Sequence, residues 1–558
     1  MRSYGRCLWA AVCMWIMLAG LLAGSARAAD KLTVRTDEGR VRGKLGDDGK
    51  VRIFLGIPYA APPVGPLRWK PPQAPGKWSG IRATTAFGSR CMQQSPFKDM
   101  RFRDPGESED CLTLNVWSPS GSQYGKLPVM VWIYGGGFVS GTTSEPRQDG
   151  EHLAHKGVVV VSMNYRLGIL GFLVLPALAA ESPEHAAGNY GLMDQWAALG
   201  WVKRNIRNFG GDPDNVTIFG ESAGAQSVSA QMASPLAQGL FAHAIGESGA
   251  EFNADKVAVR SRSDREEQDA AFVRAALGTD DLATLRGLSA EKLIQGARMS
   301  LPGVTGHFNP DVDGWFLPQS VQEIFREGKQ AHVPLLAGWN RDEPSALDVY
   351  TRVEAPSGNS GSEPAGKTGQ ETTSAPVLQP PTVASFRATA EAKFGARAEE
   401  FLKVYPDGND AEARRSAIDF NGDRFIAFAT WEWLEAQVAT GGAPVYRYHF
   451  ERPAPEDEYH PAGSGAFHSD DIEYVFGTLD SRAGAKWAPE DYKLSDLIES
   501  YWTGFARTGD PNNPGAPDWP QYKPEDGWQV MHLDVNSKAG PDTTRERYLF
   551  LESAWAAN

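Results

Sequence analysis

The stretch Val216–Gly224 reads Val-Thr-Ile-Phe-Gly-Glu-Ser-Ala-Gly, and it carries the strongest signal for the fold of this chain. Its first four residues predict a buried strand, and the Ala/Ser/Val-rich residues that follow predict a helix. A serine between these elements must occupy a sharp turn, and the glycines at 220 and 224 let the strand and the helix approach closely. The turn exposes the Ser222 hydroxyl, and the helix start leaves the Ala223 N–H free to bind an oxyanion. We therefore predict that Ser222 is a nucleophile.

Four histidines lie downstream of residue 400 as candidates for the general base that a weakly nucleophilic serine needs. With this turn, the acid follows the serine along the chain and the histidine comes last. His449 alternates with aromatic residues as in a strand, and His460 lies in an acidic, proline-flanked loop. His468 lies in a Gly/Ser-rich loop, a suitable place for a base that must meet the serine, and the fourth candidate is His532. The residues favour His468 without excluding the others.

The acid that orients the base should follow a strand between Ser222 and the histidine. Residues 340–344 (Asn-Arg-Asp-Glu-Pro) follow the apolar run Val333–Trp339 directly, and both Asp342 and Glu343 qualify. The competing interpretation is a solvated charged turn.

Three consecutive glycines, Gly135 to Gly137, follow another apolar run. Glycines in this place allow two backbone N–H groups to point at one oxygen, as an oxyanion hole requires. A phosphate-binding loop is the alternative, but no Lys-Ser/Thr pair follows in the required register.

Short β-rich runs alternate with helical patterns along the rest of the chain, which is typical of an α/β fold. The expected helix covers residues 192–209, and the expected strands are Val129–Tyr134, Val158–Met163, Val216–Phe219, Val333–Trp339 and Val445–Phe450. We predict a central, mostly parallel, twisted sheet flanked by helices. Residues 354–382 are rich in Ser, Gly, Pro and Thr and predict a disordered insertion. Since strand and helix patterns resume afterwards without a new start, an insertion into one domain spanning 30–558 is favoured over a linker.

Residues 1–29 have the order of a secretory signal peptide: a basic start, an apolar run and small residues at the end. The apolar run is shorter than the ~20 residues of a membrane-spanning helix. Removal of this leader takes away three arginines and changes the formal net charge from −14 to −17. We expect a secreted or periplasmic protein without stable membrane insertion, and the acidity argues against nucleic-acid partners.

Two of the four cysteines, Cys91 and Cys111, remain after loss of the leader. An even pair in an exported protein predicts a disulfide bond, with two buried free thiols as the alternative. No cluster of His, Cys and carboxylate residues has metal-ligand spacing along the sequence, so neither a metal nor an organic cofactor is expected.

Taken together, these segments resemble the type-B carboxylesterase and cholinesterase family, which has the α/β-hydrolase fold. The resemblance extends from about residue 38 to 520, and bacterial carboxylesterases of the para-nitrobenzyl esterase kind look most similar. It is carried by residues 54–60 (FLGIPYA), 67–69 (LRW), 108–117 (SEDCLTLNVW), 132–138 (WIYGGGF), 164–168 (NYRLG), 188–195 (GNYGLMDQ), 209–213 (FGGDP), 340–343 (NRDE), 465–477 around His468, and 508–511 (TGDP).

The resemblance implies a catalytic triad of Ser222, Glu343 and His468. It implies an oxyanion hole from the N–H groups of Gly136, Gly137 and Ala223, supporting roles near the histidine for Glu221 and Ser248, and a loop closed by Cys91 and Cys111 beside the active site. Two ion pairs, Arg68–Glu109 and Arg166–Asp194, are also implied. The loop between the cysteines offers Phe97, Met100 and Phe102 but lacks the tryptophan with which cholinesterases bind choline.

The expected function is hydrolysis of small carboxylic esters through an acyl-enzyme on Ser222, without a cofactor. Two alternatives stay open at this level. The same triad could cleave amides, lactones or carbamates, because leaving-group preference depends on pocket shape. A non-catalytic binding protein is the other alternative, and the presence of all three triad residues argues against it. The sequence does not indicate an oligomeric state.

Overall fold

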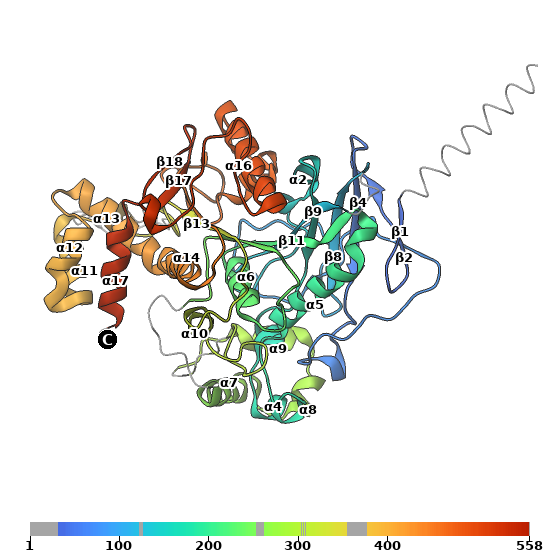
Figure 1. Ribbon diagram of the computed structural model, residues 1–558. Coiled ribbons are helices and arrows are strands. Elements are labelled where there is room, and N and C mark those ends of the chain that lie inside the picture. Colours follow the sequence, from blue (N-terminus) through green and yellow to red (C-terminus); the bar gives the residue numbers. More distant parts are fainter. Residues whose placement is uncertain are drawn as a thin grey trace, which may run out of the picture.

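A mixed sheet of 11 strands forms the centre of the computed structural model (Figure 1). The structure describes residues 32–121, 126–252, 262–302, 304, 306, 308–353 and 377–556. In spatial order the strands are β18 (Lys538–Pro541), β17 (Gln529–Leu533), β16 (Val445–Phe450), β13 (Leu335–Asn340), β12 (His243–Glu247), β11 (Gly211–Glu221), β9 (Leu127–Ile133), β10 (Val159–Met163), β8 (Thr113–Pro119), β4 (Val51–Pro58) and β3 (Lys44–Leu45).

The seven strands from β17 to β10 pair in parallel, and antiparallel strands occur at both edges of the sheet. Parallel strands covered on both faces read as continuous apolar runs, and β10 is buried at every residue. The five strands expected from the sequence are confirmed, with ends that differ by a few residues. Because the strands are parallel, their carboxyl ends share one edge of the sheet, where Ser222 follows β11.

Helices cover both faces of the sheet (Figure 1). On one face α2 (Glu151–His155) and α16 (Pro489–Thr508) pack on the strands, and on the other lie α5 (Tyr190–Asn205), α6 (Ala223–Ala233) and α14 (Phe428–Thr440). The helix expected over residues 192–209 is α5 followed by a 3₁₀ turn, Ile206–Phe209. Close packing of α14 explains Gly246 of β12, because a Cβ there would lie 2.2 Å from the Trp433 ring.

A group of helices lies beyond the β18 end of the sheet (Figure 1). It contains α11 (Val383–Phe394), α12 (Ala398–Val404), α13 (Asp410–Gly422) and α17 (Arg545–Ala556). Aromatic contacts among Phe394, Phe401, Phe420 and Phe550 hold the group together, with ring centroids 4.6–6.0 Å apart. None of the described helices is long and apolar enough to cross a bilayer.

The remaining elements lie around this framework, and all of them except α7 have at most eight residues. The helices are α3 (Gly168–Phe172), α4 (Pro176–Glu181), α7 (Arg262–Leu277), α8 (Leu282–Gly287), α9 (Ala290–Ala297), α10 (Val321–Arg326) and α15 (Ile472–Phe476), and the strands outside the main sheet are β1 (Thr33–Arg35), β2 (Arg40–Arg42), β5 (Ile81–Ala83), β6 (Arg90–Cys91), β7 (Glu107–Ser108), β14 (Thr351–Val353) and β15 (Val377–Gln379).

Two predicted segments fall largely outside the described residues. The leader, 1–29, is one of them, and residues 354–376 of the expected insertion are the other. The last part of that insertion differs from a disordered loop, because β15 pairs antiparallel with β14 and Thr382 caps α11.

Candidate active site

Ser222 occupies the sharp turn that the sequence predicts, between the end of β11 and the start of α6. Its backbone is in an unusual left-handed conformation, with φ 56° and ψ −123°. Such a conformation costs of order 1–3 kcal/mol in a non-glycine residue and is typical of functional sites. The Ser222 N–H donates to the carbonyl of Glu247 at 2.9 Å, which ties the turn to β12. Gly224 is required because a Cβ there would lie 2.0 Å from the Ile133 carbonyl oxygen.

The glycine segment 135–137 packs directly on this turn. A Cβ added to Gly135 would lie 3.0 Å from Cβ of Ser222, so the segment and the serine are in close contact. Gly136 and Gly137 have φ values of 105° and 63°, which favour glycine. In the part of the chain that the structure describes, the N–H groups of Gly136, Gly137 and Ala223 donate to no protein acceptor. Three free donors thus surround the serine, as an oxyanion hole requires.

Glu343 and His468 meet although 125 residues separate them: Nδ1 of His468 lies 2.6 Å from Oε2 of Glu343. The Glu343 side chain is only 1% exposed, and its other oxygen accepts the N–H of Asn340 at 3.0 Å. The His468 N–H in turn donates to the Pro344 carbonyl at 2.8 Å. Backbone contacts on both sides therefore hold the imidazole and the carboxylate in register.

Asp342, the other acid that the sequence leaves open, points elsewhere. Its Oδ2 accepts the N–H of Ala466 at 2.9 Å, and its Oδ1 pairs with the guanidinium of Arg415. Asp342 thus supports the loop that carries His468 without contacting the imidazole.

Glu221 lies on the opposite side of the imidazole from Glu343. Its Oε1 is 3.2 Å from Nε2 of His468, and because it precedes Ser222 directly, the serine is one residue from this contact. Burial raises the pKa of Glu221 to about 8, although the charge of His468 opposes the shift. Burial would lower the pKa of His468, but the charges of Glu221 and Glu343 outweigh it and raise that pKa to about 9. The charge of Glu221 therefore favours the protonated imidazole, and the charge of that imidazole favours the ionised form of Glu221.

Further buried polar groups lie around this core, and the sequence analysis did not single them out. Asp471 accepts hydrogen bonds from Asn340 Nδ2 at 3.1 Å and from the Tyr448 hydroxyl at 3.0 Å. Glu247 accepts from the Trp502 indole N–H at 2.7 Å. Burial raises the pKa of Asp471 to about 6 and that of Glu247 well above its ordinary value. The only sequence signal for Asp471 was its place three residues after His468.

Ser248, expected near the histidine, ends β12 in a left-handed conformation with φ 48°. It is fully buried, and its N–H donates to the Gly338 carbonyl at 2.9 Å. Within the described residues its hydroxyl has no hydrogen-bond partner.

The three other candidate histidines have partners away from the serine. His460 pairs with Asp457 at 3.0 Å and stacks on the Phe467 ring, with centroids 4.0 Å apart. His449 and His532 both contact Glu451, at 2.9 and 2.7 Å. Among these four histidines, only His468 contacts both Glu343 and Glu221, the residue that precedes Ser222.

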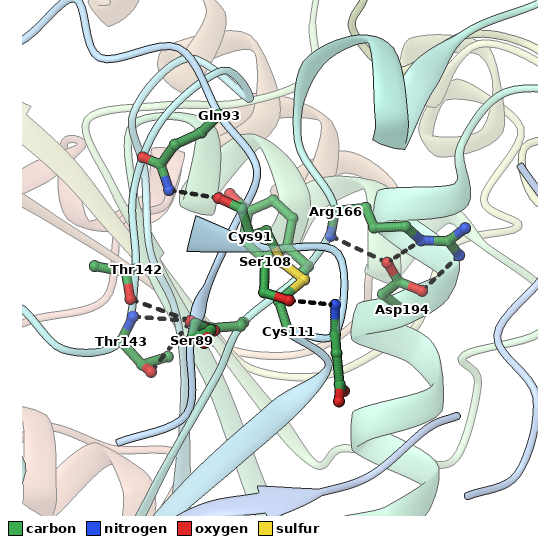
Figure 2. The surroundings of a disulfide bond; sticks show 12 residues. Ser89, Cys91, Gln93, Ser108, Cys111, Thr142, Thr143, Arg166 and Asp194 are labelled. Carbon is green, nitrogen blue, oxygen red and sulfur yellow. Dashed lines mark hydrogen bonds and ion pairs between the residues drawn. A yellow bond between two sulfur atoms is a disulfide. The ribbon is translucent and has the colours of Figure 1, made fainter. Parts of the chain in front are cut away.

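The expected disulfide bond joins Cys91 and Cys111, and Figure 2 shows it next to the Arg166–Asp194 ion pair. Arg166 contacts Asp194 with two nitrogens at 2.7 Å, and Arg68 contacts Glu109 at 2.7 and 2.6 Å, so both expected ion pairs are present.

Gln93, two residues after Cys91, connects the disulfide to the glycine segment. Its Oε1 accepts the Ser140 hydroxyl and the Gly141 N–H, both at 2.9 Å. Met100, in the same disulfide loop, reaches the glycines, because its Cε would lie 3.2 Å from a Cβ on Gly136. The loop between the cysteines is therefore part of the wall around the site.

Comparison with known proteins gives a consistent result. The model of the carboxylesterase family matches residues 30–551. The chain is 36% identical to fumonisin B1 esterase of Sphingopyxis macrogoltabida, over 94% of this chain and 92% of the relative. It is 35% identical to para-nitrobenzyl esterase of Bacillus subtilis, over 93% and 98%. A solved structure of PNB esterase matches with a TM-score of 0.74 and 35% identity, covering 93% of this chain and 99% of the other.

Proposed function

The chain belongs to the carboxylesterase family, and on that basis we propose that it hydrolyses carboxylic esters through a covalent acyl-enzyme on Ser222. The observation that carries the proposal is the 2.6 Å contact between Glu343 and His468 beside a strained serine turn and three free backbone N–H groups. A general base, an orienting carboxylate and oxyanion donors are the parts that acyl transfer by a serine requires.

In the first step Nε2 of His468 accepts the Ser222 proton while the serine oxygen bonds to the ester carbonyl carbon. The carbonyl oxygen becomes an oxyanion and accepts the N–H groups of Gly136, Gly137 and Ala223. One such donor lowers the barrier by about 3–4 kcal/mol. Glu343 stabilises the imidazolium that forms. The carbon–oxygen bond to the alcohol then breaks, and His468 returns its proton to the leaving alkoxide.

In the second step the same groups act on water. His468 accepts a proton from the water as its oxygen attacks the acyl carbon, and the Ser222 oxygen leaves with that proton. The products are a carboxylic acid and the free enzyme. The protonation state of His468 matters in both steps, because Nε2 can act as a base only when it carries no proton, and the charge of Glu221 favours the protonated form.

We propose small-molecule esters as substrates. One relative is named for fumonisin B1 and another for para-nitrobenzyl esters. The side chains available to contact a substrate include Met100 against the glycines and Phe425, whose ring meets His468 edge-on at 5.0 Å. We also propose that residues 1–29 are cleaved and that residues 30–558, which the family match spans almost completely, form one exported domain.

The test compares Ser222→Ala with the parent on a panel of esters of graded acyl and alcohol size, including a para-nitrobenzyl ester and fumonisin B1. We expect a fast release of alcohol in the parent, a trapped acyl group on Ser222 by mass spectrometry, and a loss of at least 10³-fold in kcat for the alanine variant. Ser553→Ala, an exposed serine in α17, is the matched control and should keep full activity. A folded Ser222→Ala protein as active as the parent would rule out the mechanism. Amide, lactone and carbamate probes in the same panel decide between the bond classes.

A further inference from the structure

A second group of titratable side chains lies at the carboxyl ends of β16 and β17. His449 belongs to β16, Glu451 follows this strand directly, and His532 belongs to β17. No local sequence pattern marks this group, because His532 lies 81 residues from Glu451. The expectation drawn from ligand spacing along the sequence did not cover such a group, because its members come from two separate strands.

Sheet register brings the three residues together. His449 and His532 are directly paired across the parallel strands, so their side chains lie on the same face. Glu451 is two residues beyond His449, and its N–H donates to the Leu533 carbonyl at 2.9 Å, which continues the pairing past the strand. Side chains two residues apart on an extended chain share a face, and the Glu451 carboxylate consequently lies between the two imidazoles.

The potential ligand atoms converge on one point. Nδ1 of His449 lies 2.9 Å from Oε1 of Glu451, and Nδ1 of His532 lies 2.7 Å from the same oxygen. All three ligand atoms are within 4.8 Å of one another. The side chains of His449, Glu451 and His532 are 17%, 27% and 29% exposed, respectively, so an ion and a water molecule can reach them.

We propose that His449, Glu451 and His532 bind a divalent transition-metal ion of the zinc type. Two imidazole nitrogens and one carboxylate oxygen, with water at the open position, are a common ligand set for Zn²⁺. Bonds of ~2.0–2.1 Å in a tetrahedral arrangement place ligand atoms about 3.4 Å apart. The observed 2.7–2.9 Å contacts to Glu451 would have to open by about half an ångström, which a side-chain rotation supplies.

A second group, Asp48, Glu151 and His155, also has ligand atoms within 4.8 Å of one another. It offers one imidazole and two carboxylates, and Asp48 and His155 are 40% and 35% exposed. Imidazole-rich sites suit zinc, copper, nickel and cobalt, whereas carboxylate-rich sites suit magnesium and calcium. The first group is therefore the zinc-type site, and the second provides an internal control.

The bound ion would connect the neighbouring parallel strands β16 and β17, and among the described contacts none joins its three ligands to His468, Glu343 or Glu221. Its expected effect is on stability, because an ion that binds only the folded chain stabilises it by mass action. Ester hydrolysis should not require it.

The test uses the full-length protein, freed of metal with a chelator and dialysed. Co²⁺ is titrated while its visible absorption is followed, Zn²⁺ is then added as a competitor, and Tm is measured with Zn²⁺ and with Mg²⁺. The variants are Glu451→Gln and His532→Gln, with His155→Gln as the matched control. Ester hydrolysis by every variant reports that it is folded.

We expect one equivalent of Co²⁺ per chain in the parent and in His155→Gln, displaced by Zn²⁺, and a rise in Tm with Zn²⁺ but not with Mg²⁺. Affinity should fall at least tenfold in Glu451→Gln and His532→Gln while hydrolysis stays within about twofold of the parent. Absence of binding at millimolar Co²⁺ and Zn²⁺ would overturn the proposal. Binding that survives both substitutions but disappears in His155→Gln would also overturn it and assign the ion to the other group. If a substituted variant does not fold, the Tm of the parent with Zn²⁺ provides the test instead. Binding of Zn²⁺ to the parent without a rise in Tm would then contradict the proposed site.

Discussion

Two clusters at the same edge of the sheet combine imidazole and carboxylate in opposite proportions. Around His468 one imidazole lies between two carboxyl groups, with contacts of 2.6 Å to Glu343 and 3.2 Å to Glu221. Around Glu451 one carboxylate lies between two imidazoles, with contacts of 2.9 Å to His449 and 2.7 Å to His532. The two carboxyl groups of the first cluster are at most 4% exposed, whereas the carboxylate of the second is 27% exposed.

This difference in composition explains the direction in which the pKa of the central group of each cluster is shifted. Burial disfavours the charge of His468, but its two acidic neighbours outweigh burial and raise the pKa of the imidazole to about 9. Burial likewise disfavours the charge of Glu451, but hydrogen bonds from the two histidines outweigh it and hold the pKa of that carboxyl well below its ordinary value. Both central groups keep their charge more readily than a free side chain. The first cluster lies next to the Ser222 turn and its free backbone N–H groups, and on this ground we propose it for proton transfer.

The largest expected difference between the two clusters is in kcat, when one glutamate of each cluster is replaced by glutamine. Glu343→Gln removes the charge that stabilises the His468 imidazolium and allows the wrong tautomer, and kcat should fall by about 10⁴-fold. Glu451→Gln is the same chemical change in the other cluster and should leave kcat within about twofold. Both are measured on one chromogenic ester, with circular dichroism as the check on folding. A loss below tenfold in a folded Glu343→Gln protein would contradict the role of Glu343.

A third imidazole, His243, has no carboxylate partner among the described residues and extends the comparison to stability. It is buried against the Phe505 ring at 5.7 Å, and burial lowers its pKa to about 4. The unfolded chain takes up a proton near pH 6.5, whereas the folded chain does so only near pH 4. Stability is therefore lost as the pH falls through this range, by about 3 kcal/mol in total from this group.

The measurement is the free energy of unfolding in urea at several pH values for the parent and for His243→Gln. The variant should lose about 3 kcal/mol less than the parent between pH 7 and pH 4. Equal pH dependence in the two proteins would show that His243 is not kept neutral by burial.

The sequence predicted those parts of the site that depend on local geometry. The serine turn and the glycine segment each require particular residues within a few positions, so their patterns were sufficient. The choice between Asp342 and Glu343 was different, because adjacent residues after a strand point in opposite directions, and only the fold shows which one faces His468. The residues favoured His468 but did not exclude His532, and the pairing of β17 with β16 places His532 at Glu451 instead.

The sequence could not predict which distant strands pair with one another or in which register. The strands were predicted correctly from apolar runs. An apolar run does not indicate, however, which other strand it will pair with in the sheet. Asp471 and Glu247 were missed for the same reason, since their importance comes from burial against Tyr448 and Trp502, which belong to distant elements. The family resemblance supplied Glu343 and His468 because it carries this long-range information indirectly.

Removal of one carboxyl charge from the first cluster should move the pH dependence of catalysis. The charge of Glu221 raises the pKa of His468, so Glu221→Gln lowers that pKa and keeps the imidazole unprotonated at more acidic pH. The acid limb of the kcat/KM profile should move to lower pH by about one unit. Profiles of the parent and the variant on a neutral ester test this. A limb that stays in place, or moves to higher pH, would mean that the charge of Glu221 does not raise the pKa of His468.

The smallest expected effect concerns the aromatic ring that contacts one imidazole of each cluster. Trp339 meets His449 edge-on at 6.4 Å and is buried in the core, whereas Phe425 meets His468 at 5.0 Å and is 46% exposed. Phe425 lies in a π-helical turn, Asp423–Ala427, an irregularity that often occurs at functional sites. An edge-on aromatic contact stabilises by about 0.5–1.5 kcal/mol, so Phe425→Ala should reduce kcat by about 2- to 10-fold with little change in Tm.

Phe425→Leu separates the two ways in which that ring can act. If the ring orients the imidazole, leucine should not restore kcat, because it restores volume without an aromatic edge. If the ring only fills the substrate pocket, leucine should restore kcat, and KM for bulky esters should change in the alanine variant instead. Steady-state kinetics on one small and one bulky ester distinguish these outcomes. Unchanged kcat and KM in Phe425→Ala would show that the exposed ring at His468, like the buried one at His449, plays no part in the reaction.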